Sequence, residues 1–201
     1  MHRVRTCPAA LLALNLALFA TGLAMAAEPG APAGRLGNAA RPLAYRLELT
    51  VLPDQPGFSG QTAIDVELAE PVRVLYLHGN GLNVGAATFQ APGAAPVAGT
   101  WAQVDATGVA RLEFPRALRV GRGTLQLEYT ASFARPGEGL YKSVVAGEAY
   151  AFTQFQPIDA RRMFPGFDEP GFKTPFDIAV ITRAGNAVVS NTPIASIIES
   201  A

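Results

Sequence analysis

Residues 153–170 read Thr-Gln-Phe-Gln-Pro-Ile-Asp-Ala-Arg-Arg-Met-Phe-Pro-Gly-Phe-Asp-Glu-Pro. Gln154 and Gln156 are two positions apart, so in an extended strand both side chains point to the same side. An amide offers a donor and an acceptor without carrying a charge, and such a pair can bind an ammonium group or a peptide carbonyl. The alternative is that both amides satisfy backbone groups of a loop.

The residues after this pair predict a short helix and a bend. Residues 157–164 can form one or two helical turns, with Pro157 at the first position, where proline is tolerated. Pro165 ends this helix, and residues 167–170 form a second bend.

Several charged side chains lie in the same run, and we expect them to be structural. Carboxylates in such a turn cap backbone N–H groups or pair with neighbouring arginines. A hydrolase that uses Asp168 and Glu169 as paired carboxylates is disfavoured, because adjacent residues do not flank a substrate from two sides. The charged residues of the run are Asp159, Arg161, Arg162, Asp168 and Glu169.

The whole run closely resembles a segment of the aminopeptidase N family of zinc peptidases, the gluzincins that carry an H-E-x-x-H motif. Two shorter stretches, residues 139–143 and 191–193, resemble the family's sequence before and after that segment, in the same order. The resemblance is strong over residues 139–193 and looser from Tyr45 onward. It implies the family's N-terminal β-domain, which packs against a thermolysin-like catalytic domain.

The same resemblance implies a substrate-binding role for the two glutamines. Gln156 takes the position that helps to hold the free α-amino group of the peptide, and Gln154 lies beside it in the pocket for the first side chain. The family often has glutamate at the second position, so Gln156 gives a neutral contact to the amine. The implied partners are the catalytic domain and the N-terminus of a peptide.

The zinc-binding half of the family's active site is not in these 201 residues. In an H-E-x-x-H helix two histidines bind the metal and the glutamate activates its water. This sequence contains only His2 and His78, and it has neither that motif nor the Gly-x-Met-Glu-Asn loop. We expect His78 to be a surface or hydrogen-bonded histidine.

We therefore expect no catalytic residue, no metal site, no cofactor and no peptidase activity from this chain alone; zinc is implied only for the family's catalytic domain. Two interpretations stay open. One is the substrate-side domain of an exported zinc aminopeptidase that removes N-terminal residues from peptides. The other is a stand-alone, non-catalytic β-sandwich that binds a protein or peptide.

Hydrophobic periodicity predicts an all-β fold, either an antiparallel sandwich or a saddle-like pair of sheets. Residues 45–51 and 64–68 alternate apolar and polar side chains, and the Pro-rich and Gly-containing turn 53–57 makes them a hairpin. No amphipathic helix of three turns follows the N-terminal segment. Further strands are expected at residues 72–77, 82–90, 109–114, 124–133, 176–180 and 187–191.

The N-terminus is typical of an exported protein. Positive residues precede an apolar stretch at residues 9–23, and Ala24-Met25-Ala26 gives the small-x-small pattern of a cleavage site. We therefore divide the chain into a signal peptide at residues 1–26, a flexible Ala/Gly/Pro leader at 27–42 and the β-domain at 43–201. The apolar stretch is short, is broken by Asn15 and Gly22 and is followed by no stop-transfer charges, and Cys7 precedes it, in the wrong place for a lipid-anchored cysteine. We therefore expect no stable membrane anchor and a periplasmic or secreted product.

The balanced charge of the chain argues against nucleic acid as a partner. The chain has 16 basic and 16 acidic residues, and nucleic-acid binding would need a clustered basic face.

Export predicts cleavage between Ala26 and Ala27, because signal peptidase cuts after the second small residue of such a pattern. Intact-mass measurement of protein recovered from the exported fraction checks this. A full-length product retained in the membrane would contradict it.

Overall fold

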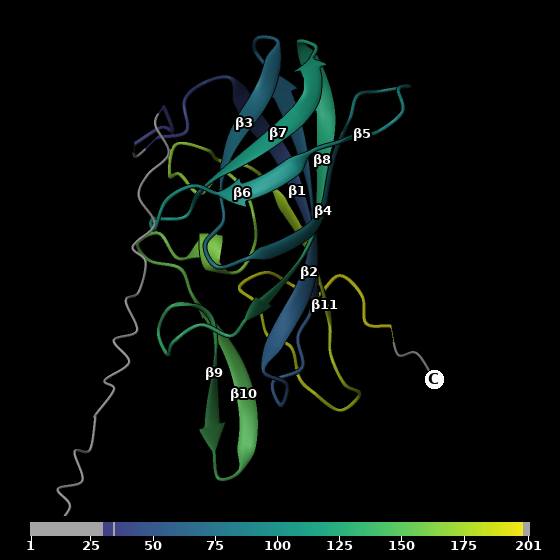
Figure 1. The fold of residues 1–201 in the computed structure, drawn as a ribbon. Helices are drawn as coiled ribbons and strands as arrows, with labels where there is room; N and C mark the ends of the chain where they lie inside the picture. Colours follow the sequence, from purple (N-terminus) through teal and green to yellow (C-terminus); the bar gives the residue numbers. More distant parts are fainter. Residues whose placement is uncertain (1–29, 34, 199–201) are drawn as a thin grey trace, which may run out of the picture.

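The computed structural model describes residues 30–33 and 35–198, and these form a two-sheet sandwich with a projecting hairpin (Figure 1). The larger sheet has six strands in the order β11-β1-β2-β8-β4-β5. Its pairs are antiparallel except that β11 runs parallel to β1. The strands are β1 (Ala40–Thr50), β2 (Gly57–Leu68), β4 (Asn83–Gln90), β5 (Val97–Ala98), β8 (Gly121–Ser132) and β11 (Phe176–Ile181).

A second sheet of three antiparallel strands, β3 (Val72–His78), β7 (Val109–Leu118) and β6 (Thr100–Gln103), lies across the first. The hairpin of β9 (Gly139–Val145) and β10 (Glu148–Gln154) extends beyond the sandwich at its lower end. The described part of the chain contains one 3₁₀ helix, η1 (Ala160–Arg162), and no helix long and apolar enough to cross a membrane.

The alternation in the sequence accounts for the sandwich. In β8, Leu125, Leu127 and Tyr129 are buried while the residues between them face outward. β2 pairs with β8 along its whole length and buries Ile64, Val66 and Leu68 on the same side. Apolar side chains of the smaller sheet fill the opposite side, so the core lies between the sheets. The predicted all-β fold is confirmed.

A smaller core cluster lies where the sandwich meets the hairpin. Its members come from strands, from residues next to strand ends and from the run that follows the hairpin, so it joins parts of the chain that are distant in sequence. The buried members are Leu49, Val51, Phe58, Leu82, Tyr129, Leu140 and Met163.

Most predicted strands form, and the β1–β2 hairpin has the expected partners. The predicted strand at residues 187–191 does not form, and that prediction is wrong. Every residue of β11 is exposed, so a further strand beside it would have had no buried face to stabilise it. The predicted helix shortens to η1, in which Arg162 and Met163 bond to carbonyls three residues earlier.

The first strand begins at Ala40, three residues before the start of the β-domain that the composition indicates. Leu36 is buried against the core and its N–H donates to Glu169. The predicted signal peptide at residues 1–26 lies outside the described residues, so the division between it and the leader stays a prediction.

Two strand glycines predict opposite responses to alanine. A Cβ at Gly123 would overlap the buried ring of Phe89, whereas a Cβ at Gly85 meets open space. We expect Gly123→Ala to lower the free energy of unfolding by roughly 1–3 kcal/mol, because the core cannot yield without shifting Phe89. Gly85→Ala is the matched control and should stay within about 0.5 kcal/mol of the parent. Urea unfolding measures both, and equal effects would contradict the packing described here.

Candidate functional site

The backbone of the run at residues 153–170 is fastened to the end of β3. His78 N–H donates to the carbonyl of Gly166 at 2.7 Å, and Gly166 N–H donates back to His78 at 2.9 Å. One residue further, Phe167 N–H donates to the hydroxyl of Tyr45 on β1 at 2.8 Å. Tyr45 is buried, so this bond fixes the bend from the core side.

Arg161 is the charged centre of this attachment. Its side chain is only 6% exposed, and its Nε donates to Asp168 Oδ2 at 2.9 Å. Nη1 donates to the carbonyl of Thr107 and Nη2 to that of Asp168, at 3.0 and 3.2 Å. A buried guanidinium is tolerated when its donors are satisfied in this way. Arg161 therefore ties the run to the turn before β7.

The other charged residues of the run are structural as well, which confirms that prediction. Arg162 Nε donates to Asp159 Oδ1 at 2.8 Å, and Glu169 Oε1 accepts from the N–H of Leu36 at 2.6 Å. Both carboxylates are thus occupied by partners within the fold. Neither they nor Asp168 offer a pair of free acids for hydrolysis.

His78 is fully buried rather than on the surface, and it is hydrogen-bonded as expected. Its Nδ1 accepts the N–H of Asp168 at 3.1 Å, so the neutral ring carries its proton on Nε2. Burial, together with the nearby positive charge of Arg161, lowers the pKa of His78 from its ordinary 6.5 to about 4. The imidazole is therefore neutral at pH 7.

The described residues do not fit a zinc ion. No group of three His, Cys, Asp or Glu side chains in residues 30–33 and 35–198 is placed to hold a metal. The imidazole of His78 already accepts a hydrogen bond and is closed off from solvent. A zinc-binding helix would have to come from outside this domain.

Gln154 and Gln156 flank a residue that faces the core. Phe155 is half-buried against the smaller cluster, and its ring meets the ring of Phe164 edge-on at 6.4 Å. Both glutamines are exposed, and within the described part of the chain neither side chain makes a hydrogen bond. Their amides are thus free to meet a ligand, rather than engaged with loop backbone.

Only one of the two glutamines lies in a strand as expected. β10 ends at Gln154, and Gln156 is the first residue of a turn. The ladder cannot continue through Pro157, which has no N–H to donate. Whether the two amides serve one ligand stays a prediction.

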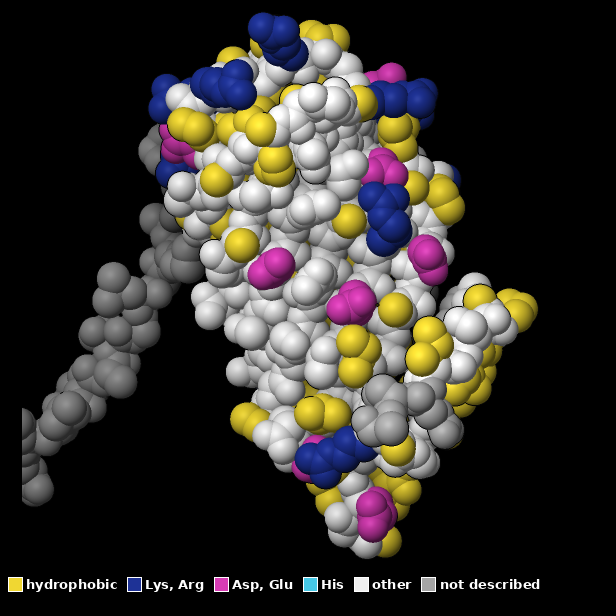
Figure 2. All heavy atoms as spheres, turned by 90° about the vertical axis from the view of Figure 1, so that its right-hand side faces the viewer, with side chains coloured by type: hydrophobic (Ala, Val, Ile, Leu, Met, Phe, Trp, Pro, Cys, Tyr) yellow, Lys and Arg dark blue, Asp and Glu magenta, His cyan; other side chains and the backbone are white. Residues whose placement is uncertain are grey.

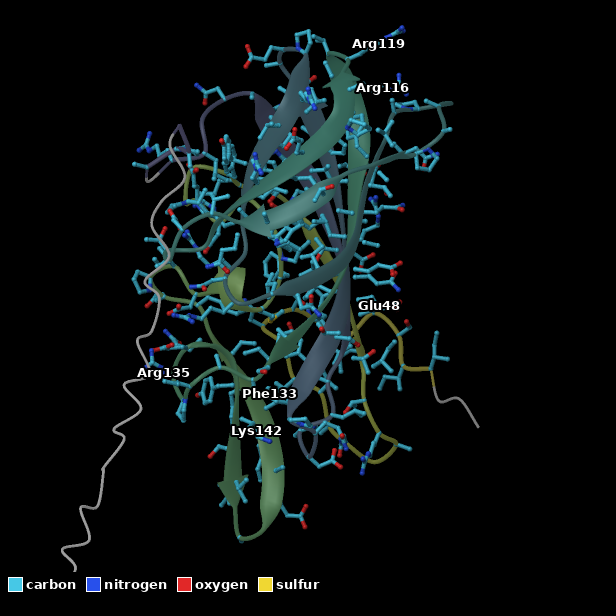
Figure 3. The ribbon with its side chains drawn as sticks, viewed as in Figure 1. Glu48, Arg116, Arg119, Phe133, Arg135 and Lys142 are labelled. Carbon is cyan, nitrogen blue, oxygen red and sulfur yellow. The ribbon has the colours of Figure 1, made fainter. Side chains whose placement is uncertain are left out.

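Lys142 and Phe133, which the sequence did not single out, lie in contact at the base of the hairpin. Lys142 Nζ donates to the carbonyl of Gln55 at 3.0 Å and lies 5.6 Å from the centre of the Phe133 ring. Figure 3 shows Phe133 and Lys142 together at the lower end of the sandwich. Leu140 is buried in the smaller cluster beside them. A lone lysine in a strand carries no sequence signal for such a role.

Beyond this base the hairpin and β11 leave large apolar side chains exposed. Figure 2 shows hydrophobic side chains at the lower end of the molecule. Exposed apolar side chains that gather in this way are typical of surfaces that meet another protein, a membrane or a ligand. They are Val144, Val145, Tyr150 and Phe152 on the hairpin, and Phe176, Ile178, Val180 and Ile181 on β11.

Comparison with known proteins gives consistent matches. Residues 41–199 match the model of the Peptidase M1 N-terminal domain. Aminopeptidase N of Acetobacter pasteurianus is 32% identical over 167 residues, covering 81% of this chain and 46% of that protein. Aminopeptidase M1-C of Oryza sativa subsp. japonica is 34% identical, covering 80% and 19%. The thyrotropin-releasing hormone-degrading ectoenzyme of Rattus norvegicus is 33% identical, covering 80% and 16%. The chain thus spans less than half the length of these relatives.

The buried His78 predicts that stability falls in mild acid. The unfolded chain binds a proton near pH 6.5 and the folded chain only near pH 4, so the unfolded state holds more protons between these values. His78 therefore contributes fully above pH 6.5, and its contribution is lost as the pH falls towards 4. Between pH 7 and 5 we expect the free energy of unfolding to drop by roughly 2 kcal/mol.

Urea unfolding at several pH values measures this slope. His78→Gln is the control, because glutamine keeps a hydrogen-bond acceptor but does not titrate. Its slope between pH 7 and 5 should be flatter than that of the parent. Parallel slopes would show that His78 does not cause the acid sensitivity.

Proposed function

This chain belongs to the family of peptidase M1 N-terminal domains, and on that basis we propose that it forms the substrate-side domain of a zinc aminopeptidase. The M1 family is zinc-dependent, and this chain matches only the N-terminal domain of its relatives. In this proposal a catalytic domain supplies the zinc and its activated water. The present domain holds the peptide so that its N-terminal residue is removed.

The observation that carries the proposal is the pair of free amides beside a rigidly held run. Gln154 and Gln156 are exposed and without internal partners, while Phe155 between them is packed on Phe164. A side-chain amide oxygen accepts a hydrogen bond from an ammonium group, and that bond is charge-assisted. We assign this contact to Gln156 and the flank of the first side-chain pocket to Gln154.

The rigidity of the run matters for this role. An anchored amino group fixes where the scissile carbonyl lies relative to the metal, so displacement of the anchor lowers the rate. Two contacts fix the position of Gln156. The Arg161–Asp168 ion pair lies on one side of it, and Lys142 at the base of the hairpin lies on the other. Both contacts join the residues around Gln156 to the sandwich, so Gln156 is held in a fixed position.

We assign the exposed apolar residues of β9, β10 and β11 to contact with the catalytic domain. They lie on the hairpin that ends at Gln154 and on the edge strand, so a covering domain would reach the two amides as well. Burial of such side chains contributes about 25 cal/mol per Å² of apolar area. The exposed apolar area supports this assignment.

We further propose that the protein works after export, in the periplasm or as a secreted product. Support comes from the positive N-terminus, the apolar stretch at residues 9–23 and the Ala24-Met25-Ala26 pattern. These residues lie outside the described part of the chain.

The experiment that tests the function combines this chain with the catalytic part of a family member that lacks its own N-terminal domain. We expect a complex that hydrolyses aminoacyl-anilides with a free amino group and leaves N-acetylated ones intact. A complex without hydrolysis would favour the stand-alone binding module instead. If the two parts do not associate, the proposal is wrong.

In that complex Gln156→Ala should lower kcat/KM for peptides with a free amino terminus. Loss of a charge-assisted hydrogen bond costs roughly 1.5–3 kcal/mol, which corresponds to about a 10- to 100-fold decrease. Gln156→Glu should preserve or improve kcat/KM, because a carboxylate binds an ammonium group at least as strongly. Equal rates for both variants and the parent would remove Gln156 from the site.

A further inference from the structure

The end of β7, the turn after it and the start of β8 form an unusually basic stretch. Residues 115–123 read Pro-Arg-Ala-Leu-Arg-Val-Gly-Arg-Gly, with three arginines and no acidic residue. β7 ends at Leu118 and β8 begins at Gly121, so Arg119 and Val120 form the tip of the turn. Figure 3 shows Arg116 and Arg119 at the end of the molecule opposite Phe133 and Lys142.

Arg116 and Arg119 differ from most arginines of the domain in having no acidic partner within the described residues. The third arginine of the turn, Arg122, reaches Glu67 only at 4.0 Å, and its side chain is 73% exposed. An unpaired guanidinium keeps its planar fork of donors available for a phosphate group. Nine other described arginines pair with a carboxylate: Arg41, Arg46, Arg73, Arg111, Arg122, Arg135, Arg161, Arg162 and Arg183.

The acids near the turn do not neutralise it. Glu67 is shared between Arg41 and Arg122, and Glu113 is shared between Arg73 and Arg111. Glu70 is exposed in the adjacent turn between β2 and β3, and Asp65, opposite Thr124 of β8, is paired with Arg46. The end therefore keeps a positive excess.

One exposed apolar side chain lies among these arginines. Val120 is 58% exposed at the tip, with Arg119 before it and Arg122 two positions after it. Cations around an exposed apolar group suit the boundary between lipid head groups and acyl chains, whereas a free phosphate ion would use only the cations.

We propose that the β7–β8 turn docks reversibly on a membrane surface rich in anionic phospholipids. Arg116 and Arg119 contact head-group phosphates, and Val120 enters the boundary below them. Because this turn lies opposite the β9–β10 hairpin, docking leaves the hairpin and Gln154 uncovered. The contact needs no membrane-spanning segment, and each arginine contributes only about a 5-fold gain in affinity, so binding is peripheral.

Sedimentation with vesicles tests this in the full chain. We expect binding to phosphatidylglycerol vesicles, weaker binding to phosphatidylcholine, and a loss of roughly 25-fold on anionic vesicles for Arg116→Gln with Arg119→Gln. The matched control is Arg135→Gln with Arg183→Gln, which removes the same charge from exposed positions elsewhere. Residues 1–29 are unchanged in every variant, so the difference reports the turn. Equal affinity of the two double variants would overturn the proposal.

A probe at the turn locates the contact. In a Cys7→Ser background, an environment-sensitive fluorophore on Val120→Cys should shift to the blue with anionic vesicles. The same probe on Val144→Cys, similarly exposed at 64% but on the hairpin, should not shift. A larger shift at position 144 would overturn the proposal, as would release of the bound chain by millimolar inorganic phosphate at constant ionic strength.

Discussion

The ion pair of buried Arg161 with half-buried Asp168 determines how residues 153–170 are held against the sandwich. Transfer of a guanidinium out of water costs several kcal/mol, and it is recovered only where the donors meet well-placed acceptors. Arg161 meets this condition by joining its own run to the carbonyl of Thr107, far away in sequence. Once that position is set, the bridge between His78 and Gly166 follows, and so does the course of the chain from Phe155 to Phe167. The contacts of Arg161 therefore fix where the exposed amides of Gln154 and Gln156 lie.

The alternation of apolar residues placed most of the sandwich strands, because burial on one face of a sheet repeats every second residue, but it did not reveal the short strands β5 and β6. It could not reveal that His78 is buried, since the glycines and asparagine after it indicate a strand end, and its partner Asp168 lies ninety positions later. The hairpin of β9 and β10 exposes apolar side chains, so its strands lack the alternation that signals a half-buried face. Family resemblance directed attention to Gln154 and Gln156, but only the structure places Phe155 as their anchor and Gln156 in a turn.

The proposed function divides recognition and bond cleavage between two domains. The described residues supply hydrogen-bonding groups and apolar area but no set of metal ligands. In that proposal, the pocket for the peptide N-terminus can vary in sequence without disturbing the geometry around a metal. The relative placement of the two domains then becomes part of the active site, so we expect β11 and the hairpin to affect activity without touching substrate.

The parallel pairing of β11 with β1 has a consequence for synthesis and folding. Tyr45 lies opposite Phe176, so the sheet is completed by a contact between residues roughly 130 positions apart. When a chain emerges N-terminus first, β1 is available long before its edge partner exists. During that interval β1 presents unpaired N–H and C=O groups that can pair with another chain. A holdase chaperone that shields this edge until β11 emerges would therefore raise the yield of folded protein more than one that acts after synthesis is complete.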